Sequence, residues 1–119
     1  MHDERIYRNV SLLRAELDRA RPGRKAVVLA NGIFDILHVG HVRYLRDAAS
    51  LGGILVVALN GDESARRLKG AGRPFVPAEE RAEILLALRS VDYVLIFDEP
   101  TVDRIIDVLR PDFHAKGTD

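Results

Sequence analysis

The sequence predicts a three-layer α/β/α fold in which a parallel sheet is covered by helices on both faces. Short apolar runs alternate along the chain with segments whose apolar residues recur at helical spacing. Two of the apolar runs end at Asn-Gly, a strong turn signal. Strand, turn and helix then follow one another twice, an order that favours parallel strands joined by right-handed helical crossovers.

The first elements are an amphipathic helix and a buried strand. Leu12, Leu13 and Leu17 recur at helical spacing and predict a helix over residues 9–20. Residues 26–30 form a β-branched apolar run that suits a strand buried on both faces. We expect Asn31 and Gly32 to turn the chain directly after it.

The same pattern repeats in the middle of the chain. The spacing predicts a helix over residues 41–51, a strand over 54–59 and a short helix over 62–68. Gly52 and Gly53 tolerate the left-handed conformation of a helix C-cap, and Asp62 has the side chain of an N-cap.

The last part of the chain begins with an irregular segment. Residues 69–77 contain two glycines and two prolines, which predict a mobile loop of the kind that often carries function. After it we expect a helix over residues 78–90, a strand over 93–97, a helix capped by Thr101 through residue 109, and a strand over 113–115.

The composition argues against several classes of function. The 119 residues are 47% hydrophobic and 30% charged, which fits one globular domain. Lys plus Arg and Asp plus Glu both total 18, so no net positive field favours nucleic acid or an anionic membrane. The absence of cysteine excludes disulfides and thiol catalysis, and no signal peptide or membrane span is visible. We therefore expect a cytoplasmic protein.

The segment after the first strand carries the strongest chemical signal. Ligands of open parallel sheets lie beyond the carboxyl ends of strands, at helix N-termini. Here His38 and His41 stand three residues apart, which puts both imidazoles on one side of a helix start. Gly40 removes a side chain so that an anion can approach the backbone, and the helix end adds unpaired N–H groups. The segment is therefore suited to phosphate.

This segment, Gly32-Ile33-Phe34-Asp35-Ile36-Leu37-His38-Val39-Gly40-His41, resembles the signature of the cytidylyltransferase-like nucleotidyltransferases, the His-x-Gly-His superfamily. From about residue 25 to the end, further stretches look like that family in order, among them Arg66-Arg67-Leu68-Lys69-Gly70, residues 77–81, and Lys116-Gly117-Thr118-Asp119. The pattern is closest to the heptose 1-phosphate adenylyltransferase domain and is similar to glycerol-3-phosphate cytidylyltransferase. The fold implied is Rossmann-like.

The resemblance implies transfer of a nucleotidyl group from a nucleoside triphosphate, with Mg²⁺, to a phosphorylated sugar or alcohol, with release of pyrophosphate. It favours ATP over CTP and a heptose 1-phosphate-like acceptor. An acceptor phosphate is already a nucleophile at neutral pH, so positioning and charge neutralisation suffice for catalysis.

The family implies a role for each matching residue. The catalytic candidates are His38, His41 and Lys69. The nucleotide-binding candidates are Asn31, Gly32, Ile33, Phe34, Gly40, Arg81, Lys116, Gly117 and Asp119. The substrate-binding candidates are Asp35, Arg67 and Arg89.

Structural interpretations stand beside several of these roles. Asp35 has the side chain to hold its loop by accepting backbone N–H groups, and Arg81 and Arg89 have the spacing of exposed helix arginines paired with glutamates. Lysine in a loop is usually only solvated. Two imidazoles lack the third protein ligand of a zinc site, so no metal site is expected.

Domain organisation and rival functions complete the sequence-based hypotheses. Residues 1–119 read as one nucleotidyltransferase domain, with a leading helix and turn in 1–24 and a catalytic core in 25–119. The family continues into a Ser-Thr-Thr-type phosphate-binding motif, so the chain reads as truncated at its C-terminus. The alternatives are cytidylyl transfer to glycerol 3-phosphate, a catalytically silent nucleotide-binding module, and a flavodoxin-like signalling domain. Homodimerisation is common in the family.

Overall fold

The structure is a computed structural model that describes residues 3–20 and 25–115. Strands and helices alternate along these ranges in the order β1 (Ile6–Tyr7), α1 (Val10–Ala20), β2 (Val27–Gly32), α2 (Val39–Ala49), β3 (Ile54–Asn60), α3 (Asp62–Lys69), α4 (Ala78–Leu86), β4 (Tyr93–Phe97), α5 (Asp103–Leu109) and β5 (Phe113–Ala115). The strands form a five-stranded sheet in the order β1-β4-β3-β2-β5, and every pairing in it is parallel. The predicted α/β class with a parallel sheet is confirmed.

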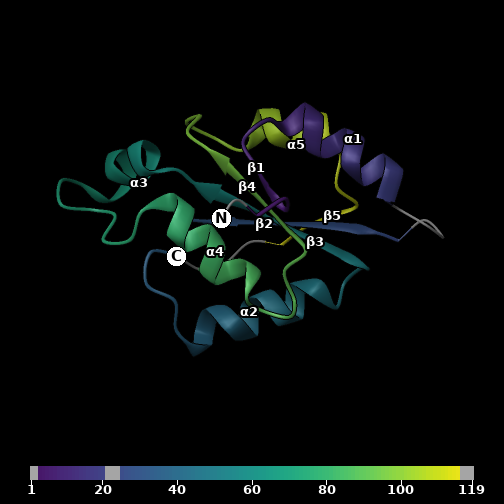
Figure 1. The fold of residues 1–119 in the computed structure, drawn as a ribbon, viewed down its shortest axis with the longest axis horizontal. Helices are drawn as coiled ribbons and strands as arrows, with labels where there is room; N and C mark the ends of the chain where they lie inside the picture. The colour runs from purple at the N-terminus through teal and green to yellow at the C-terminus, as the bar shows by residue number, and fades with distance from the viewer. Residues whose placement is uncertain (1–2, 21–24, 116–119) are drawn as a thin grey trace.

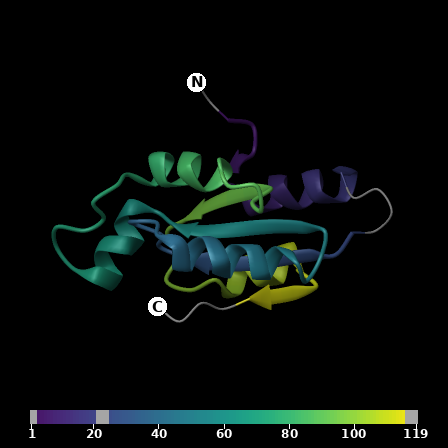
Figure 2. The ribbon, with the colours of Figure 1, turned by 90° about the horizontal axis from the view of Figure 1, so that it is seen from below.

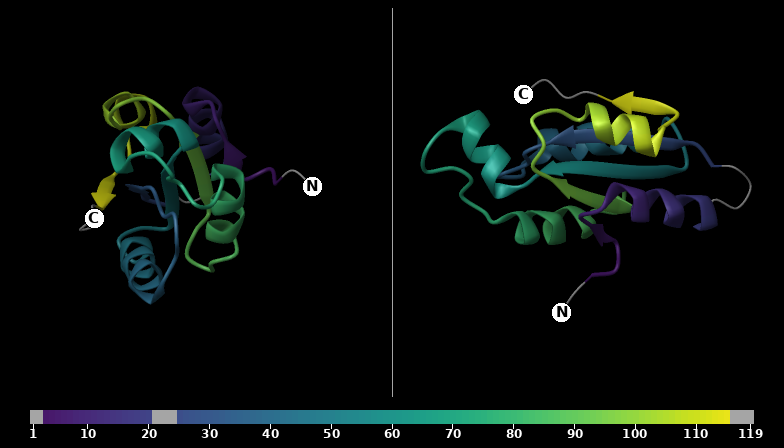
Figure 3. Two further views of the ribbon diagram at one scale, coloured as in Figure 1. Left: turned by 90° about the vertical axis from the view of Figure 1, so that its left-hand side faces the viewer. Right: turned by 90° about the horizontal axis from the view of Figure 1, so that it is seen from above.

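Helices cover both faces of the sheet. Figure 1 shows α1 and α5 above the sheet and α2 and α4 below it. Figure 2 shows the same sheet from the side of α2, with the strands running toward the end at which α3 lies. In the left view of Figure 3, α3 lies in front of the strand ends instead of on either face.

Period-two alternation of the strand residues builds a separate core on each face. All seven residues of β3 are buried, as a central parallel strand requires. Val28, Leu55 and Val57 pack toward Leu45 and Leu85 of α2 and α4. On the other face, α1 and α5 pack against the odd-numbered residues of β2 and the even-numbered residues of β3, such as Val27, Leu29, Val56 and Ala58.

The order of the strands creates one switch point. β3 and β4 follow β2 along the chain on one side of it, whereas β5 returns to pair with the other side of β2. Helices leave β2 and β4 toward opposite faces, so the topology changes direction between β2 and β5, and such sheets bind ligands outside the carboxyl ends of the strands at this point. The histidine segment follows β2 at this edge.

Several boundaries differ from the sequence-based expectations. The Asn31-Gly32 turn was wrong, because both residues continue β2 and pair with Ala58 and Leu59. β1 was missed, since its two residues are too short to show alternation, although Ile6 pairs with Val94. The predicted helix over 78–90 ends at Leu86, where the amide of Leu88 bonds the carbonyl three residues back instead of four.

Two caps also differ. Gly52 and Gly53 do not adopt the left-handed region, and α2 ends on Ser50 in an ordinary helical conformation. They are small because an added Cβ would lie 2.7 Å from the Ala26 carbonyl oxygen or the Lys25 Cβ. Asp62 is the first residue of α3 and not its cap, since its carboxylate accepts hydrogen bonds from α4 instead.

Candidate functional site

The two histidines form a reciprocal cap at the start of α2. His38 is the N-cap residue, and its Nδ1 accepts the Gly40 N–H at 3.0 Å. His41 Nδ1 in turn accepts the His38 N–H at 3.2 Å. This is the arrangement of a capping box, built here from two imidazoles in place of a hydroxyl and a carboxylate. The helix therefore begins two residues before the expected residue 41.

The cap determines which nitrogen of each imidazole ring carries the hydrogen. A nitrogen that accepts an N–H carries no hydrogen, so each neutral ring holds its hydrogen on Nε2. The ring centroids lie 4.1 Å apart, with His38 exposed and His41 half-buried. The rings are tilted by 38° to each other, and the pair places two Nε2–H groups beside the helix N-terminus, which suits an anionic oxygen.

Gly40 makes room for the His38 ring. A Cβ at this position would lie 2.7 Å from His38 Cε1. The space freed by the glycine is therefore filled by the His38 ring, which can fold back over the backbone N–H only if residue 40 has no side chain. The expectation that the glycine also lets an anion approach the backbone stays a prediction.

The buried ring of Phe34 packs against His41. Phe34 is buried with φ at 49°, and its ring meets His41 edge to face at 5.4 Å between centroids. Gly32 makes room for this ring, because an added Cβ would lie 2.9 Å from it. The other neighbour, Tyr44, stacks on Phe34 and donates its hydroxyl to the Ala115 carbonyl at 2.7 Å. The packing thus links α2 to the end of β5.

A second link joins the carboxyl ends of β2 and β5. His114 Nε2 lies 2.7 Å from Asn31 Oδ1. Asn31 thereby contacts the strand that leads to the predicted nucleotide-binding residues Lys116, Gly117 and Asp119, which lie outside the described residues. His114 is a residue of β5, as the expected strand over 113–115 requires.

Arg81 lies beneath the site. Only 1% of this residue is exposed, and its guanidinium donates to the carbonyls of Val76, Ile33 and Asn60 and to the Asp62 carboxylate, each at 2.7 or 2.8 Å. The alternative of an exposed arginine paired with a glutamate is wrong. Arg81 instead holds together the loops that follow β2 and β3, and the Ile33 backbone is one of its partners.

Asp35 joins the histidine segment to the loop between α3 and α4. Its buried carboxylate accepts the N–H groups of Phe75 and Val76 and the Nε–H of Arg73, at 2.7 to 3.0 Å. Burial alone would raise the pKa of Asp35, but these hydrogen bonds and the Arg73 charge together lower it below its ordinary value of 3.8. The structural interpretation of Asp35, as an acceptor of backbone N–H groups, is confirmed.

Lys69 and Arg67 lie on α3, not on the following loop. Lys69 is the exposed last residue of the helix, and the loop begins at Gly70, where φ is 99°. Arg67 bonds the Asp98 carbonyl and pairs with Glu63 at 3.2 Å. Lys69 is thus the more available cation of the two.

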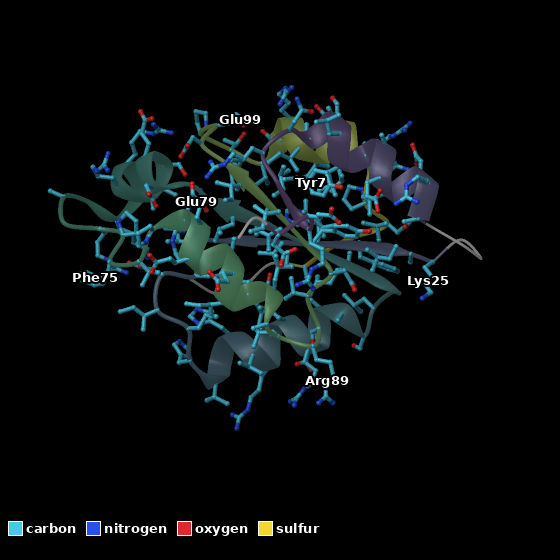
Figure 4. The ribbon with its side chains drawn as sticks, viewed as in Figure 1. Tyr7, Lys25, Phe75, Glu79, Arg89 and Glu99 are labelled. Atoms are coloured by element: carbon cyan, nitrogen blue, oxygen red, sulfur yellow. The ribbon has the colours of Figure 1, made fainter. Side chains whose placement is uncertain are left out.

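The structure does not bring Arg89 to this site. The residue follows the end of α4, and Asp92, three positions on, pairs with the start of β3 through Leu55. Figure 4 shows Arg89 away from the end of the molecule that carries Phe75. A helix that starts at the carboxyl edge of a parallel sheet ends near the opposite edge, which places Arg89 away from the histidine segment; its role in substrate binding stays a prediction.

Sequence reasoning missed two acidic residues at strand ends. Asp98 follows β4 and accepts the Ser64 N–H at 2.9 Å, which caps α3 from a distant part of the chain. An added Cβ at Gly61 would lie 2.5 Å from this carboxylate. The rule that directed attention to the end of the first strand would have found Asp98 and Asp62 as well.

Neither a membrane helix nor a metal cluster occurs in the described ranges. None of the helices there has the length and apolarity to span a bilayer. The same residues contain no group of three or more His, Asp or Glu side chains arranged to hold a metal ion.

Known proteins match this chain over most of its length. The family model described as Cytidylyltransferase-like matches residues 29–119. "Bifunctional protein HldE" of Syntrophotalea carbinolica is 52% identical over 118 residues, which are 99% of this chain and 24% of that protein. The protein of the same name from Geobacter metallireducens is 54% identical over 104 residues, 87% of this chain and 21% of that protein. The chain thus spans about a quarter of the length of these curated relatives.

A solved structure agrees with the sequence matches. The "lipopolysaccharide core biosynthesis protein from Thermoplasma volcanium" superposes with a TM-score of 0.68 at 32% identity. The match covers 76% of this chain and 72% of that one.

Proposed function

This chain belongs to the cytidylyltransferase-like family, and from that premise we propose that it transfers a nucleoside monophosphate from a nucleoside triphosphate to a phosphorylated sugar. An oxygen of the acceptor phosphate bonds to the α-phosphorus while the bond from that phosphorus to the bridging oxygen breaks. Pyrophosphate leaves with the electron pair. No covalent enzyme intermediate is required.

The reciprocal histidine cap is the observation that carries this proposal. It leaves both imidazoles with hydrogen on Nε2 at the start of α2, where the helix macrodipole also favours negative charge. Two such donors stabilise the charge that develops on the α-phosphoryl oxygens, and they are ordered before substrate arrives. His38 and His41 are therefore assigned as catalytic residues.

The remaining roles follow from position. Lys69, exposed at the end of α3, is assigned to the leaving pyrophosphate. Asn31, Gly32, Ile33, Phe34 and Gly40 are assigned to nucleotide binding, and Arg81 positions the loops around them. Lys116, Gly117 and Asp119, which follow β5 in the sequence, are assigned to the nucleotide as well. Residues 25–119 form the catalytic core in this proposal.

Mg²⁺ enters with the triphosphate. Since the described residues offer no cluster of metal ligands, the cation is proposed as part of the nucleotide substrate and not as a resident ion. It would neutralise phosphate charge there.

The relatives favour a specific substrate pair. They are named HldE, and the sequence is closest to the heptose 1-phosphate adenylyltransferase pattern, so we assign ATP as donor and a heptose 1-phosphate as acceptor. A cytoplasmic site of action, expected from the composition, and homodimer formation, expected from the family resemblance, are part of the proposal.

Calorimetric titration with non-hydrolysable ATP and CTP analogues in the presence of Mg²⁺ tests the nucleotide site. We expect selective binding of the ATP analogue, lost in a His38→Ala, His41→Ala double variant and retained in Arg46→Ala, a matched change further along α2. Pyrophosphate release should require ATP and heptose 1-phosphate and should not occur with CTP and glycerol 3-phosphate. Binding without any turnover would instead support a nucleotide-binding module.

A further inference from the structure

The loop between α3 and α4 borders an open pocket that no residue of the histidine cap lines. Its volume is about 350 Å³, and it is lined by Asp62 and Arg66 of α3 and by loop residues that include Arg73 and Phe75. The volume lies in the range of small-molecule sites, roughly 300–1,000 Å³. We call it the α3–α4 loop pocket.

Arg73 is held in place on the wall of this pocket. Its Nε donates to Asp35 at 2.7 Å, and its guanidinium carbon lies 4.5 Å above the centroid of the Phe75 ring. These contacts fix the plane of the guanidinium and still leave its two terminal nitrogens as donors. A guanidinium ordered before binding loses little entropy when it meets an anion.

Arg66 adds a second positive charge. It is exposed, and within residues 3–20 and 25–115 its side chain forms no ion pair or hydrogen bond. Two guanidinium groups on one pocket are the usual means by which proteins bind a phosphate.

Phe75 and Asp62 make the pocket better suited to a sugar ring than to a polyphosphate. Phe75 is 63% exposed, although Asp35 fixes its backbone, and Figure 4 shows it at the end of the molecule toward which the strands run. An exposed rigid aromatic ring offers an apolar surface to the C–H face of a pyranose. The Asp62 carboxylate accepts hydrogen bonds, which suits sugar hydroxyls and disfavours a row of phosphates.

We propose that the α3–α4 loop pocket binds the acceptor as a phosphorylated pyranose, with its phosphate on Arg66 and Arg73 and its ring against Phe75. This assignment rests on the nucleotidyl transfer proposed above and names the acceptor subsite for it. Asp35 connects the pocket to the segment that carries His38, three residues further on. The apolar ring requires a pyranose phosphate in preference to a short phosphoalcohol.

Titration calorimetry on the chain tests the pocket separately from turnover. The probes are heptose 1-phosphate, glycerol 3-phosphate, inorganic phosphate and the non-hydrolysable ATP analogue with Mg²⁺. The variants are Arg66→Gln and Phe75→Ala, with Arg46→Gln and Leu12→Ala as exposed controls of matched chemistry. Because all four positions are exposed, thermal unfolding should be close to that of the unaltered chain.

Arg66→Gln should weaken heptose 1-phosphate and inorganic phosphate about tenfold or more, as expected for a lost charged hydrogen bond. Phe75→Ala should weaken heptose 1-phosphate several-fold and leave inorganic phosphate unchanged. Neither change should alter the affinity for the ATP analogue, and glycerol 3-phosphate should be insensitive to Phe75→Ala.

Weaker binding of the ATP analogue in Arg66→Gln, with unchanged sugar phosphate binding, would assign the pocket to the nucleotide and overturn the proposal. Equal binding by all variants, or no sugar phosphate binding by the unaltered chain, would overturn it too. Pocket-dependent binding without pyrophosphate release would leave the pocket standing and refute the transfer reaction. Pyrophosphate release that neither Arg66→Gln nor Phe75→Ala alters would support the transfer reaction and refute the pocket assignment.

Discussion

The Arg81 guanidinium donates to the Asp62 carboxylate at 2.8 Å, and this pair joins a completely buried cation to an anion that is about half exposed. The same guanidinium also bonds three backbone carbonyls. One side chain therefore holds the loop after β2, the end of β3 and the loop before α4 in a fixed relation. The candidate site rests on that relation.

Replacing Arg81 by methionine should destabilise the protein by about 3–5 kcal/mol, because the change leaves buried carbonyls and a carboxylate without their donor. Urea unfolding followed by circular dichroism measures this loss. Arg89→Met, at an exposed position, should change the free energy of unfolding by less than about 0.5 kcal/mol. Equal effects of the two substitutions would contradict the role given to Arg81.

Substitutions at His38 should separate capping from catalysis. His38→Ala removes the N-cap acceptor and should cost about 0.5–2 kcal/mol of stability. His38→Asn restores an acceptor for the cap but has no Nε2 donor, so it should recover most of that stability. Both variants should lose about 10²–10³-fold in turnover. Recovery of turnover by asparagine would assign His38 to the cap alone.

Gly40→Ala should lower turnover with little change in stability. Alanine gains up to about 1 kcal/mol in helix propensity over glycine. Its Cβ, however, would lie 2.7 Å from His38 Cε1 and would push the ring off the cap, which costs a similar amount. Steady-state kinetics beside thermal unfolding checks this, and Ser50→Ala at the other end of α2 is the control. Undiminished turnover would show that the ring position is unimportant.

Asp35 should make stability depend on pH at the acid end. Burial opposes the charged carboxylate, but the bonds from Phe75, Arg73 and Val76 outweigh it and lower the pKa of Asp35 in the folded state. The stabilisation is therefore complete above the unfolded-state pKa, near 3.8, and is lost as pH falls through the lower folded value. Asp35→Asn should be less stable at pH 7 by about 1–3 kcal/mol.

Urea unfolding from pH 7 down to pH 2 measures the Asp35 contribution. The difference between the unaltered chain and Asp35→Asn should shrink at the acid end. Asp47→Asn, the loss of an exposed carboxylate on α2, is the control for removing one negative charge. A constant gap across the whole range would mean that Asp35 does not titrate with folding.

Most strands and helices of the fold could be predicted from the sequence. Apolar runs such as residues 54–59 are visible because burial on both faces leaves no polar residue before Asn60 at the end of the strand. β1 was invisible, since two residues cannot show a period. Helix ends were displaced wherever a side chain decided them, as at His38, because capping geometry depends on which way a ring turns.

The sequence predicted many residues of the candidate site but not the contacts that these residues make. A glycine between two histidines marked the segment, but its reason, room for the His38 ring, depends on the packed geometry. Arg73 and Phe75 escaped notice because their meaning comes from Asp35, forty or so positions away along the chain. Arg89 was misplaced because sequence position alone does not say at which edge of the sheet a helix ends.

The pairing of β5 with β2 has a consequence for the order in which the molecule is assembled. Asn31 and His114 are separated by 83 positions in sequence, and the Val27 amide meets Asp112 across 85. Contacts of such separation carry the largest loop-closure cost and form late. During synthesis on the ribosome, β2, β3 and β4 can associate well before β5 emerges. We therefore expect the β2–β5 pairing to form after β2, β3 and β4 have associated, so ligand binding that depends on this pairing would report a late step in the folding of these strands.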